Sequence, residues 1–108
     1  MPMTMEVYKD GGGKARWRLK SSNGQTVATG GEAYASASNA KRAAQAFMSN
    51  AGVSNFDVYG DSGGGHRWRA TARNGQIVAT GGEAFSSQAS ARRAATNVQK
   101  NVGTAALT

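Results

Sequence analysis

The sequence contains one unit of about fifty residues written twice, and the two copies align without a gap. A shift of 51 positions places residues 5–52 on residues 56–103, and 25 of the 48 aligned positions are identical. A unit of this length can bury only a marginal hydrophobic core when it folds alone. We therefore expect one domain over residues 1–108, in which both copies share a core with pseudo-twofold symmetry around a linker at 53–55.

Each copy shows the pattern of three strands followed by one helix. Alternation of apolar and polar residues predicts the strands, and apolar residues at spacings of three and four predict the helix. Ser36 and Ser87 are placed as helix N-caps, and Gly52 and Gly103 as C-cap glycines. The predicted strands are 5–8, 15–20 and 25–29 with repeat equivalents that include 56–59 and 76–80, and the predicted helices are 37–50 and 88–101.

Glycine marks the turns between the predicted strands. Clusters at 11–13 and 63–65 predict flexible hairpin tips. Asn23-Gly24 and Asn74-Gly75 predict tight type I′ hairpins, since both residues tolerate positive φ. These patterns together predict an α+β domain with two tandem β-β-β-α repeats, a single antiparallel sheet of six strands, and both helices on one face.

The second strand of each copy places a tryptophan between two arginines. Successive side chains of a strand point to opposite faces, so Trp17 and Leu19 share one face while the neighbouring basic residues occupy the other. The same parity applies to Trp68 and Ala70. We expect the two tryptophans to be equivalent anchors of the shared core.

Residues suited to catalysis are few. His66 is the one histidine, its repeat partner is Ala15, and we expect it in an exposed turn. The six acidic residues form three repeat-related pairs, of which Asp10 and Asp61 are expected to bond their own turn backbone. We expect no enzyme activity, catalytic residue, metal site or cofactor. The acidic pairs are Glu6 with Asp57, Asp10 with Asp61, and Glu32 with Glu83, the last expected to favour the start of each helix.

Lysine and arginine total 13 against six acids, giving a net charge of +7. This balance favours polyanionic partners, but it also lies in the range that keeps small domains soluble. The chain has no cysteine, so it has no disulfide framework and no zinc-thiolate site. Neither a signal-peptide pattern nor an apolar run of membrane-spanning length is present, so we expect a cytoplasmic protein without a membrane partner.

The basic residues opposite the tryptophans form the candidate binding site. An open sheet face with arginine and aromatic side chains can follow a phosphate backbone and stack bases. The alternative is an ordinary solvated face with weak ion pairs across strands. Glycine pairs at 30–31 and 81–82 also precede the helices, where backbone amides can receive an anion. The candidate anion- or nucleic-acid-binding residues are Arg16, Arg18, Lys20, Arg67, Arg69 and Arg73, with Tyr8 and Tyr59.

Several short motifs occur in order in both copies and resemble the YegP-like proteins, a family of unknown function. They include Val7-Tyr8-Lys9-Asp10, Trp17-Arg18-Leu19-Lys20 and Asn23-Gly24-Gln25, with matching residues in the second copy. The resemblance covers nearly the whole chain and implies units of three strands and a helix. It also implies that two units, in tandem or from two chains, build one antiparallel sheet with exchanged C-terminal helices. It brings no established catalytic residues.

Two functions follow from these observations. The first is a non-catalytic module that binds another protein or assembles with itself as a homodimer. The second is binding of nucleic acid or a nucleotide through the arginine-rich sheet face.

Overall fold

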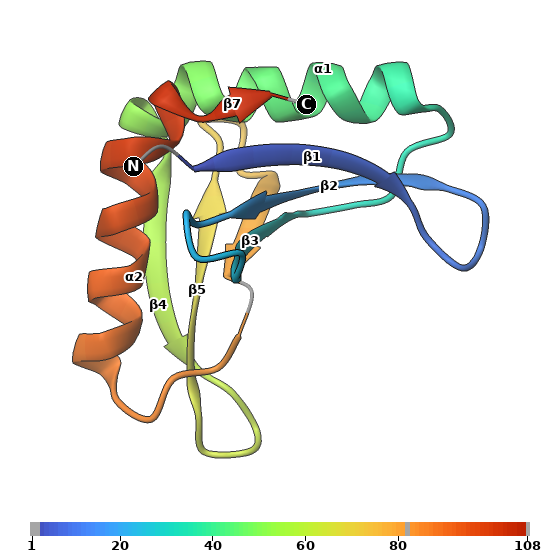
Figure 1. Cartoon of the computed structure of the whole chain (residues 1–108). Coiled ribbons are helices and arrows are strands. Elements are labelled where there is room, and N and C mark those ends of the chain that lie inside the picture. The colour runs from blue at the N-terminus through green and yellow to red at the C-terminus, as the bar shows by residue number, and fades with distance from the viewer. Residues whose placement is uncertain (1–2, 82, 108) are drawn as a thin grey trace.

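The computed structural model describes residues 3–81 and 83–107 and shows two β-β-β-α units joined through one sheet (Figure 1). The predicted helices and the predicted strand 15–20 are found with the predicted bounds. The strands are β1 (Thr4–Lys9), β2 (Ala15–Lys20), β3 (Thr26–Gly30), β4 (Asn55–Gly60), β5 (His66–Thr71), β6 (Ile77–Gly81) and β7 (Ala106–Leu107). The helices are α1 (Ala37–Asn50) and α2 (Gln88–Asn101), each followed by a 3₁₀ turn, Ala51–Val53 and Val102–Thr104.

The strands form one sheet in the order β4-β5-β6-β3-β2-β1-β7. Each unit contributes an antiparallel meander, and the two meanders join where β3 pairs antiparallel with β6. The described part of the sheet has a seventh strand that the sequence pattern did not predict. β7 pairs in parallel with β1, with Thr4 beside Ala106 and Met5 beside Leu107, so the sheet is mixed. The α+β class and the tandem repeats are confirmed.

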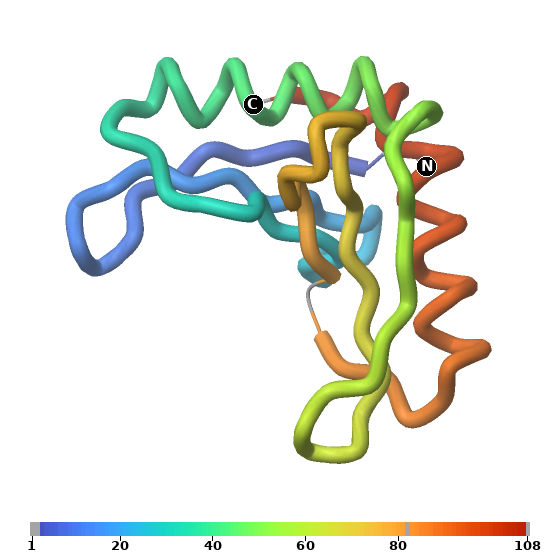
Figure 2. Tube along the Cα trace, turned by 180° about the vertical axis from the view of Figure 1, so that it is seen from behind, coloured from blue at the N-terminus to red at the C-terminus, as the bar shows by residue number. Residues whose placement is uncertain are grey.

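Both helices cover the same face of the sheet. α1 packs on β1 and β2, and α2 packs on β4 and β5. Figures 1 and 2 show that the strands of the two units diverge, so the molecule has two arms with a helix on the outer side of each. The opposite sheet face, here called the open face, looks into the space between the arms. Exchange of helices between chains stays a prediction.

An aromatic chain joins the two units inside the core. Trp17 stacks on Phe47 of α1 with ring centroids 5.2 Å apart, and Phe56 of β4 stacks on Trp68 at 5.5 Å. Phe47 and Phe56 link these two stacks at 6.2 Å. The tryptophans are 1% and 0% exposed, which confirms that they are equivalent core anchors.

The last glycine of β3 and of β6 lies directly against a tryptophan ring. A Cβ atom at Gly30 would lie 2.6 Å from Nε1 of Trp17, and one at Gly81 would lie 2.6 Å from Nε1 of Trp68. The next residue, Gly31, donates its amide to the carbonyl of Val78 at 3.2 Å. Gly30 and Gly31 therefore serve strand packing and pairing and do not form an open anion loop. Gly82 lies outside the described residues.

The hairpin turns differ in type from the prediction. Gly24 and Gly75 have φ of +86°, but no described non-glycine residue has a positive φ, so Asn23 and Asn74 do not adopt type I′ geometry. The amide of Gly24 bonds to the carbonyl of Ser21 at 3.0 Å, which is a type I turn followed by a left-handed glycine. This loop is one residue longer than a type I′ hairpin turn, so the third strand starts at Thr26 and not at the predicted Gln25.

Gly52 and Gly103 do not act as the helix C-caps that the sequence predicts. Ser36 and Ser87 cap the helix N-termini as predicted, accepting from the amides of Asn39 and Ser90. At the other end, Ala51 and Val102 keep right-handed helical angles and lead into the 3₁₀ turns. Gly52 and Gly103 lie within those turns and have no positive φ, so the prediction was wrong.

Candidate binding site on the open sheet face

A row of six side chains crosses the open face through both units. Strand register places each residue directly opposite the next, and the row reads the same from either end: acid, arginine, threonine, threonine, arginine, acid. This open-face row consists of Glu6, Arg18, Thr29, Thr80, Arg69 and Asp57.

The pleat of β2 and β5 explains why arginine faces out along the row. Trp17 and Trp68 are fixed in the core, so the residues on either side of each tryptophan must project to the open face. At the centre of the row, the hydroxyls of Thr29 and Thr80 are hydrogen-bonded at 3.1 Å. The repeat thus produces one continuous surface from two copies, centred on a pseudo-twofold axis.

The carboxylates of the row pair with basic side chains on the same sheet face. Nε of Arg18 donates to Oε1 of Glu6 at 2.8 Å, and Nζ of Lys20 lies 3.7 Å from Oε2 of the same residue. Nε of Arg69 lies 3.8 Å from Oδ2 of Asp57 in the second unit. The bond from Arg18 is the main reason that the pKa of Glu6 is lowered.

Two further ion pairs lie at the hairpin tips, one in each unit. Nε of Arg16 donates to Oδ2 of Asp10 at 2.7 Å, and Nε of Arg67 donates to Oδ2 of Asp61 at 3.0 Å. The other oxygen of each aspartate accepts two turn amides, those of Gly12 and Lys14 or those of Gly63 and Gly65. The expected turn role of these two aspartates is therefore present.

Both aspartates favour the charged form for these reasons. The bond from Arg16, followed by the backbone bond from Lys14, lowers the pKa of Asp10. The backbone bond from Gly65, followed by the bond from Arg67, lowers the pKa of Asp61. Each hairpin tip is thus tied to its arginine through a charged carboxylate.

Tyrosine rings hold the two arginines of the row. The guanidinium carbon of Arg18 lies 4.4 Å from the ring centroid of Tyr8, and that of Arg69 lies 4.7 Å from the ring centroid of Tyr59. Such cation–π contacts add to the ion pairs and restrict the long arginine side chains. The structure therefore brings together Tyr8, Tyr59 and five of the six predicted basic residues.

The charges of the open face nearly cancel. Five basic residues there meet four carboxylates, leaving little excess charge. The two helices carry Lys41, Arg42, Arg92, Arg93 and Lys100 and contain no acidic residue. The net charge of +7 is therefore concentrated away from the row.

Two residues lie elsewhere than the sequence suggested. Arg73 is in the turn after β5 and lines a hollow with Asn50, Val53 and Ser54, apart from the other predicted basic residues. His66 is the first residue of β5 and is half-buried, and its backbone pairs with Phe85 through bonds of 2.8 and 2.7 Å. The expectation of an exposed turn histidine was wrong, because the backbone bridge extends the strand up to the hairpin.

In the remaining acidic pair, Glu83 makes a contact that the sequence did not predict. α1 and α2 begin at Ala37 and Gln88, beyond Glu32 and Glu83. The carboxylate of Glu83 accepts a bond from Nε2 of Gln25 in the other unit at 3.0 Å. Sequence reasoning missed this contact, because Gln25 and Glu83 belong to different units and are 58 residues apart in the sequence.

Two kinds of feature are missing from the described residues. Residues 3–81 and 83–107 contain no group of three or more His, Asp or Glu side chains arranged to hold a metal ion. In the same part of the chain, no helix is both long and apolar enough to cross a membrane.

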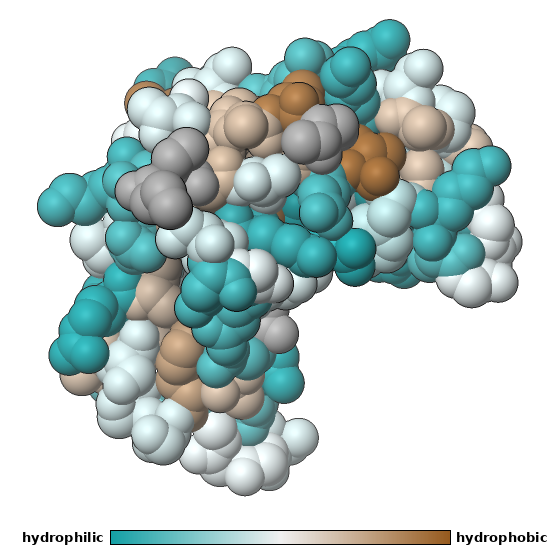
Figure 3. Space-filling model, viewed as in Figure 1, coloured by the Kyte–Doolittle hydropathy of each residue, from teal (hydrophilic) through white to brown (hydrophobic). Residues whose placement is uncertain are grey.

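The open face lies in a notch of the molecular surface. Figure 3 shows that side chains leave the space between the arms unfilled and that hydrophilic residues line much of its visible border. The site is thus a concave, polar and nearly charge-balanced surface to which the two repeats contribute equivalent residues.

Comparison with known proteins agrees with this architecture. The sequence matches the family model "Domain of unknown function (DUF1508)" twice, over residues 10–56 and 61–108. Among curated proteins the sequence has no significant match.

Two solution NMR structures share the fold with a TM-score of 0.82 each. One is a UPF0339 protein from Shewanella oneidensis, 22% identical, with 99% of this chain and 90% of that chain covered. The other is YegP from E. coli, a protein of unknown function, 23% identical, with 99% and 91% covered. With two family matches that together span most of its length, the chain belongs to the DUF1508 family and carries two copies of its domain.

Proposed function

We propose that this protein is a non-catalytic module that binds a protein partner through the open face. The observation that carries the proposal is the ordered, charge-balanced row in which each arginine is held by a carboxylate and a tyrosine ring. Arginine and tyrosine are enriched where proteins meet, and side chains that are already ordered lose less entropy on binding.

The arginines retain donors for a partner. Each ion pair in the row uses Nε, the guanidinium nitrogen nearest the backbone. The side chains of Arg18 and Arg69 are 35% and 41% exposed, so a partner can still reach part of each guanidinium group. A partner that presents carbonyl or carboxylate oxygens at two equivalent positions would complement both units at once.

Nucleic-acid binding at the same face is the second candidate. The exposed guanidinium groups and tyrosine rings favour it, since both can contact a nucleic-acid strand. Its main driving force is counterion release from neutralised phosphates. A phosphate on this face would compete with four carboxylates already paired to the basic groups, so a protein partner suits the face better.

Affinity capture tests the proposal. The wild-type protein and a Tyr8→Ala/Tyr59→Ala double variant are immobilised, and bound proteins are identified and then purified for direct titration. We expect at least one protein that binds the wild type and loses about tenfold or more in affinity with the double variant. A purified partner that binds both forms equally, or nucleic acid that binds more tightly than any protein, would contradict the proposal.

A further inference from the structure

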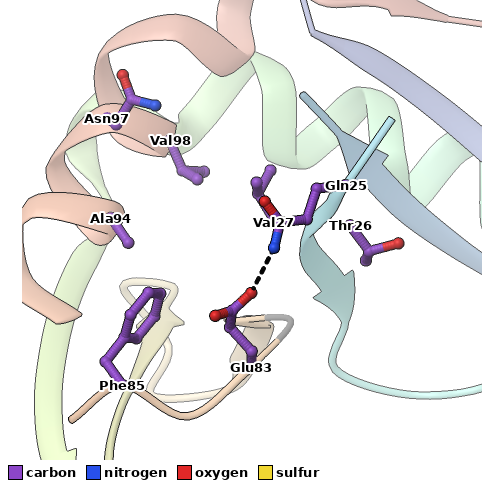
Figure 4. A pocket seen from close by; sticks show the side chains of 8 residues that line it. All are labelled: Gln25, Thr26, Val27, Glu83, Phe85, Ala94, Asn97 and Val98. Atoms are coloured by element: carbon purple, nitrogen blue, oxygen red, sulfur yellow. Dashed lines mark hydrogen bonds between the residues drawn. The ribbon is translucent and has the colours of Figure 1, made fainter. Parts of the chain in front are cut away.

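We propose that a pocket at the joint of the two units binds a small primary alkylammonium ion. The pocket lies between the start of β3, the segment leading from β6 to α2, and α2 itself, away from the open-face row. Its volume is about 170 Å³ (Figure 4). The lining residues are Gln25, Thr26, Val27, Glu83, Phe85, Ala94, Asn97 and Val98.

The walls of this joint pocket are apolar and one side is acidic. Figure 4 shows Val27, Ala94 and Val98 around the space, with Phe85 beside Glu83 below it. Thr26 and Asn97 border the pocket with their polar ends directed away from its centre. An occupant therefore meets hydrocarbon on several sides and a carboxylate on one.

The polar side of the pocket offers two acceptor groups to an ammonium ion. Nε2 of Gln25 donates to Oε2 of Glu83 at 3.0 Å, which orients both groups. This bond leaves Oε1 of Glu83 and the amide oxygen of Gln25 as acceptors. A primary ammonium has three N–H donors and a positive charge, so it can use both oxygens and neutralise the carboxylate. The ring of Phe85 adds a surface that attracts cations.

The size of the pocket limits the ligand. One water molecule occupies about 30 Å³ in the liquid, so about 170 Å³ holds roughly five or six non-hydrogen atoms. A four-carbon chain with an ammonium group has about that size. Its chain would lie against Val27, Ala94 and Val98.

The residues that line the joint pocket differ from their repeat equivalents at one important position, which supports a binding site at only one of the two equivalent places. Gln25, Val27, Glu83 and Ala94 have identical repeat equivalents, namely Gln76, Val78, Glu32 and Ala43. Val98, however, is replaced by Phe47, whose larger ring stacks on Trp17. Thus the same carboxylate and amide occur twice, but the side chain behind them is small only beside Glu83.

Titration with n-butylammonium, followed through backbone and side-chain amide signals in NMR, tests the proposal. We expect saturable shifts at Gln25, Glu83 and Val98. Neither 1-butanol, which lacks the charge, nor butyrate, which has the opposite charge, should produce them. Absence of saturable shifts, or equal shifts with all three compounds, would overturn the proposal.

Matched variants assign the site. Glu83→Gln should weaken n-butylammonium binding about tenfold or more, because a charged hydrogen bond is lost. The repeat-equivalent Glu32→Gln should change it less than about twofold. Val98→Phe, which copies Phe47, should close the pocket. Since Glu83 is exposed, its variant remains informative if Val98→Phe fails to fold. Equal binding by the wild type and Glu83→Gln would refute the assignment.

Discussion

Thr29 and Thr80 occupy equivalent positions in the two repeats and hydrogen-bond to each other through their hydroxyls at 3.1 Å. They stand opposite each other where β3 pairs with β6, so this contact marks the pseudo-twofold axis of the molecule. The three strands of each meander follow in the same order on either side of this pair, and β7 beside β1 is the one described strand without a counterpart. The core and the open-face row both depend on that junction.

The first prediction concerns the junction. Residues 1–52 alone would expose the edge of β3, which can pair with β3 of a second copy in place of β6. We expect this half to be either unfolded or a homodimer in sedimentation experiments, because a unit of this size buries too little apolar surface alone. A folded, stable monomer would show that the core is not shared.

The second prediction concerns the tryptophans. Trp17→Ala and Trp68→Ala should each lower the free energy of unfolding by about 3–5 kcal/mol, since each removes a fully buried ring from the aromatic chain. Chemical denaturation measures the change. Similar losses are expected at both sites, and an unchanged transition midpoint at either would mean that its ring is not part of the core.

The third prediction concerns the glycines beside those rings. Gly30→Ala and Gly81→Ala should each cost about 1–3 kcal/mol, because the new methyl group would overlap the indole of Trp17 or Trp68. Gly52→Ala is the matched control, since its Cβ would meet nothing within 4 Å and its φ is not positive. Thermal unfolding should show no loss for Gly52→Ala. An equal loss in all three variants would assign the effect to backbone flexibility instead.

The sequence predicted most of the fold because the repeat makes each pattern visible twice. The helix bounds and the buried tryptophans follow from side-chain periodicity and are found in the structure. β7 was not predictable, since two residues carry no period and the strand exists only through its pairing with β1. Turn type was also missed, because Asn-Gly suits both the type I′ turn and the longer loop observed here.

The candidate site was predictable only in part. Strand parity correctly placed Arg16, Arg18 and Tyr8 on one face with their equivalents. It could not show which acidic residues lie opposite, because that depends on strand register. The contact between Gln25 and Glu83 joins residues of different units, so no local pattern indicates it.

The fourth prediction concerns pH. The pKa values of Asp10 and Asp61 are lowered in the folded protein, so these groups stabilise it above the unfolded aspartate value of about 3.9. That stabilisation is lost as the pH falls through the lower folded pKa values. The double variant Asp10→Asn/Asp61→Asn should melt below the wild type at pH 7. The difference in Tm should shrink as the pH falls below about 3.9. A difference that is constant with pH would mean that charge at these positions contributes nothing.

The measurement that tests the proposed function most directly compares two variants with equal charge. One replaces Arg16, Arg18, Arg67 and Arg69 on the open face with Gln. The other replaces Lys41, Arg42, Arg93 and Lys100 on the helices, so both lose four positive charges.

Binding of the captured, purified protein partner is measured by calorimetry for the wild type and both variants at ~150 mM salt. We expect the open-face variant to lose about a hundredfold in affinity and the helix variant to stay within about threefold, because only the first removes contact residues. Equal losses in both variants would contradict the proposal, since the partner would then respond to net charge and not to the open face.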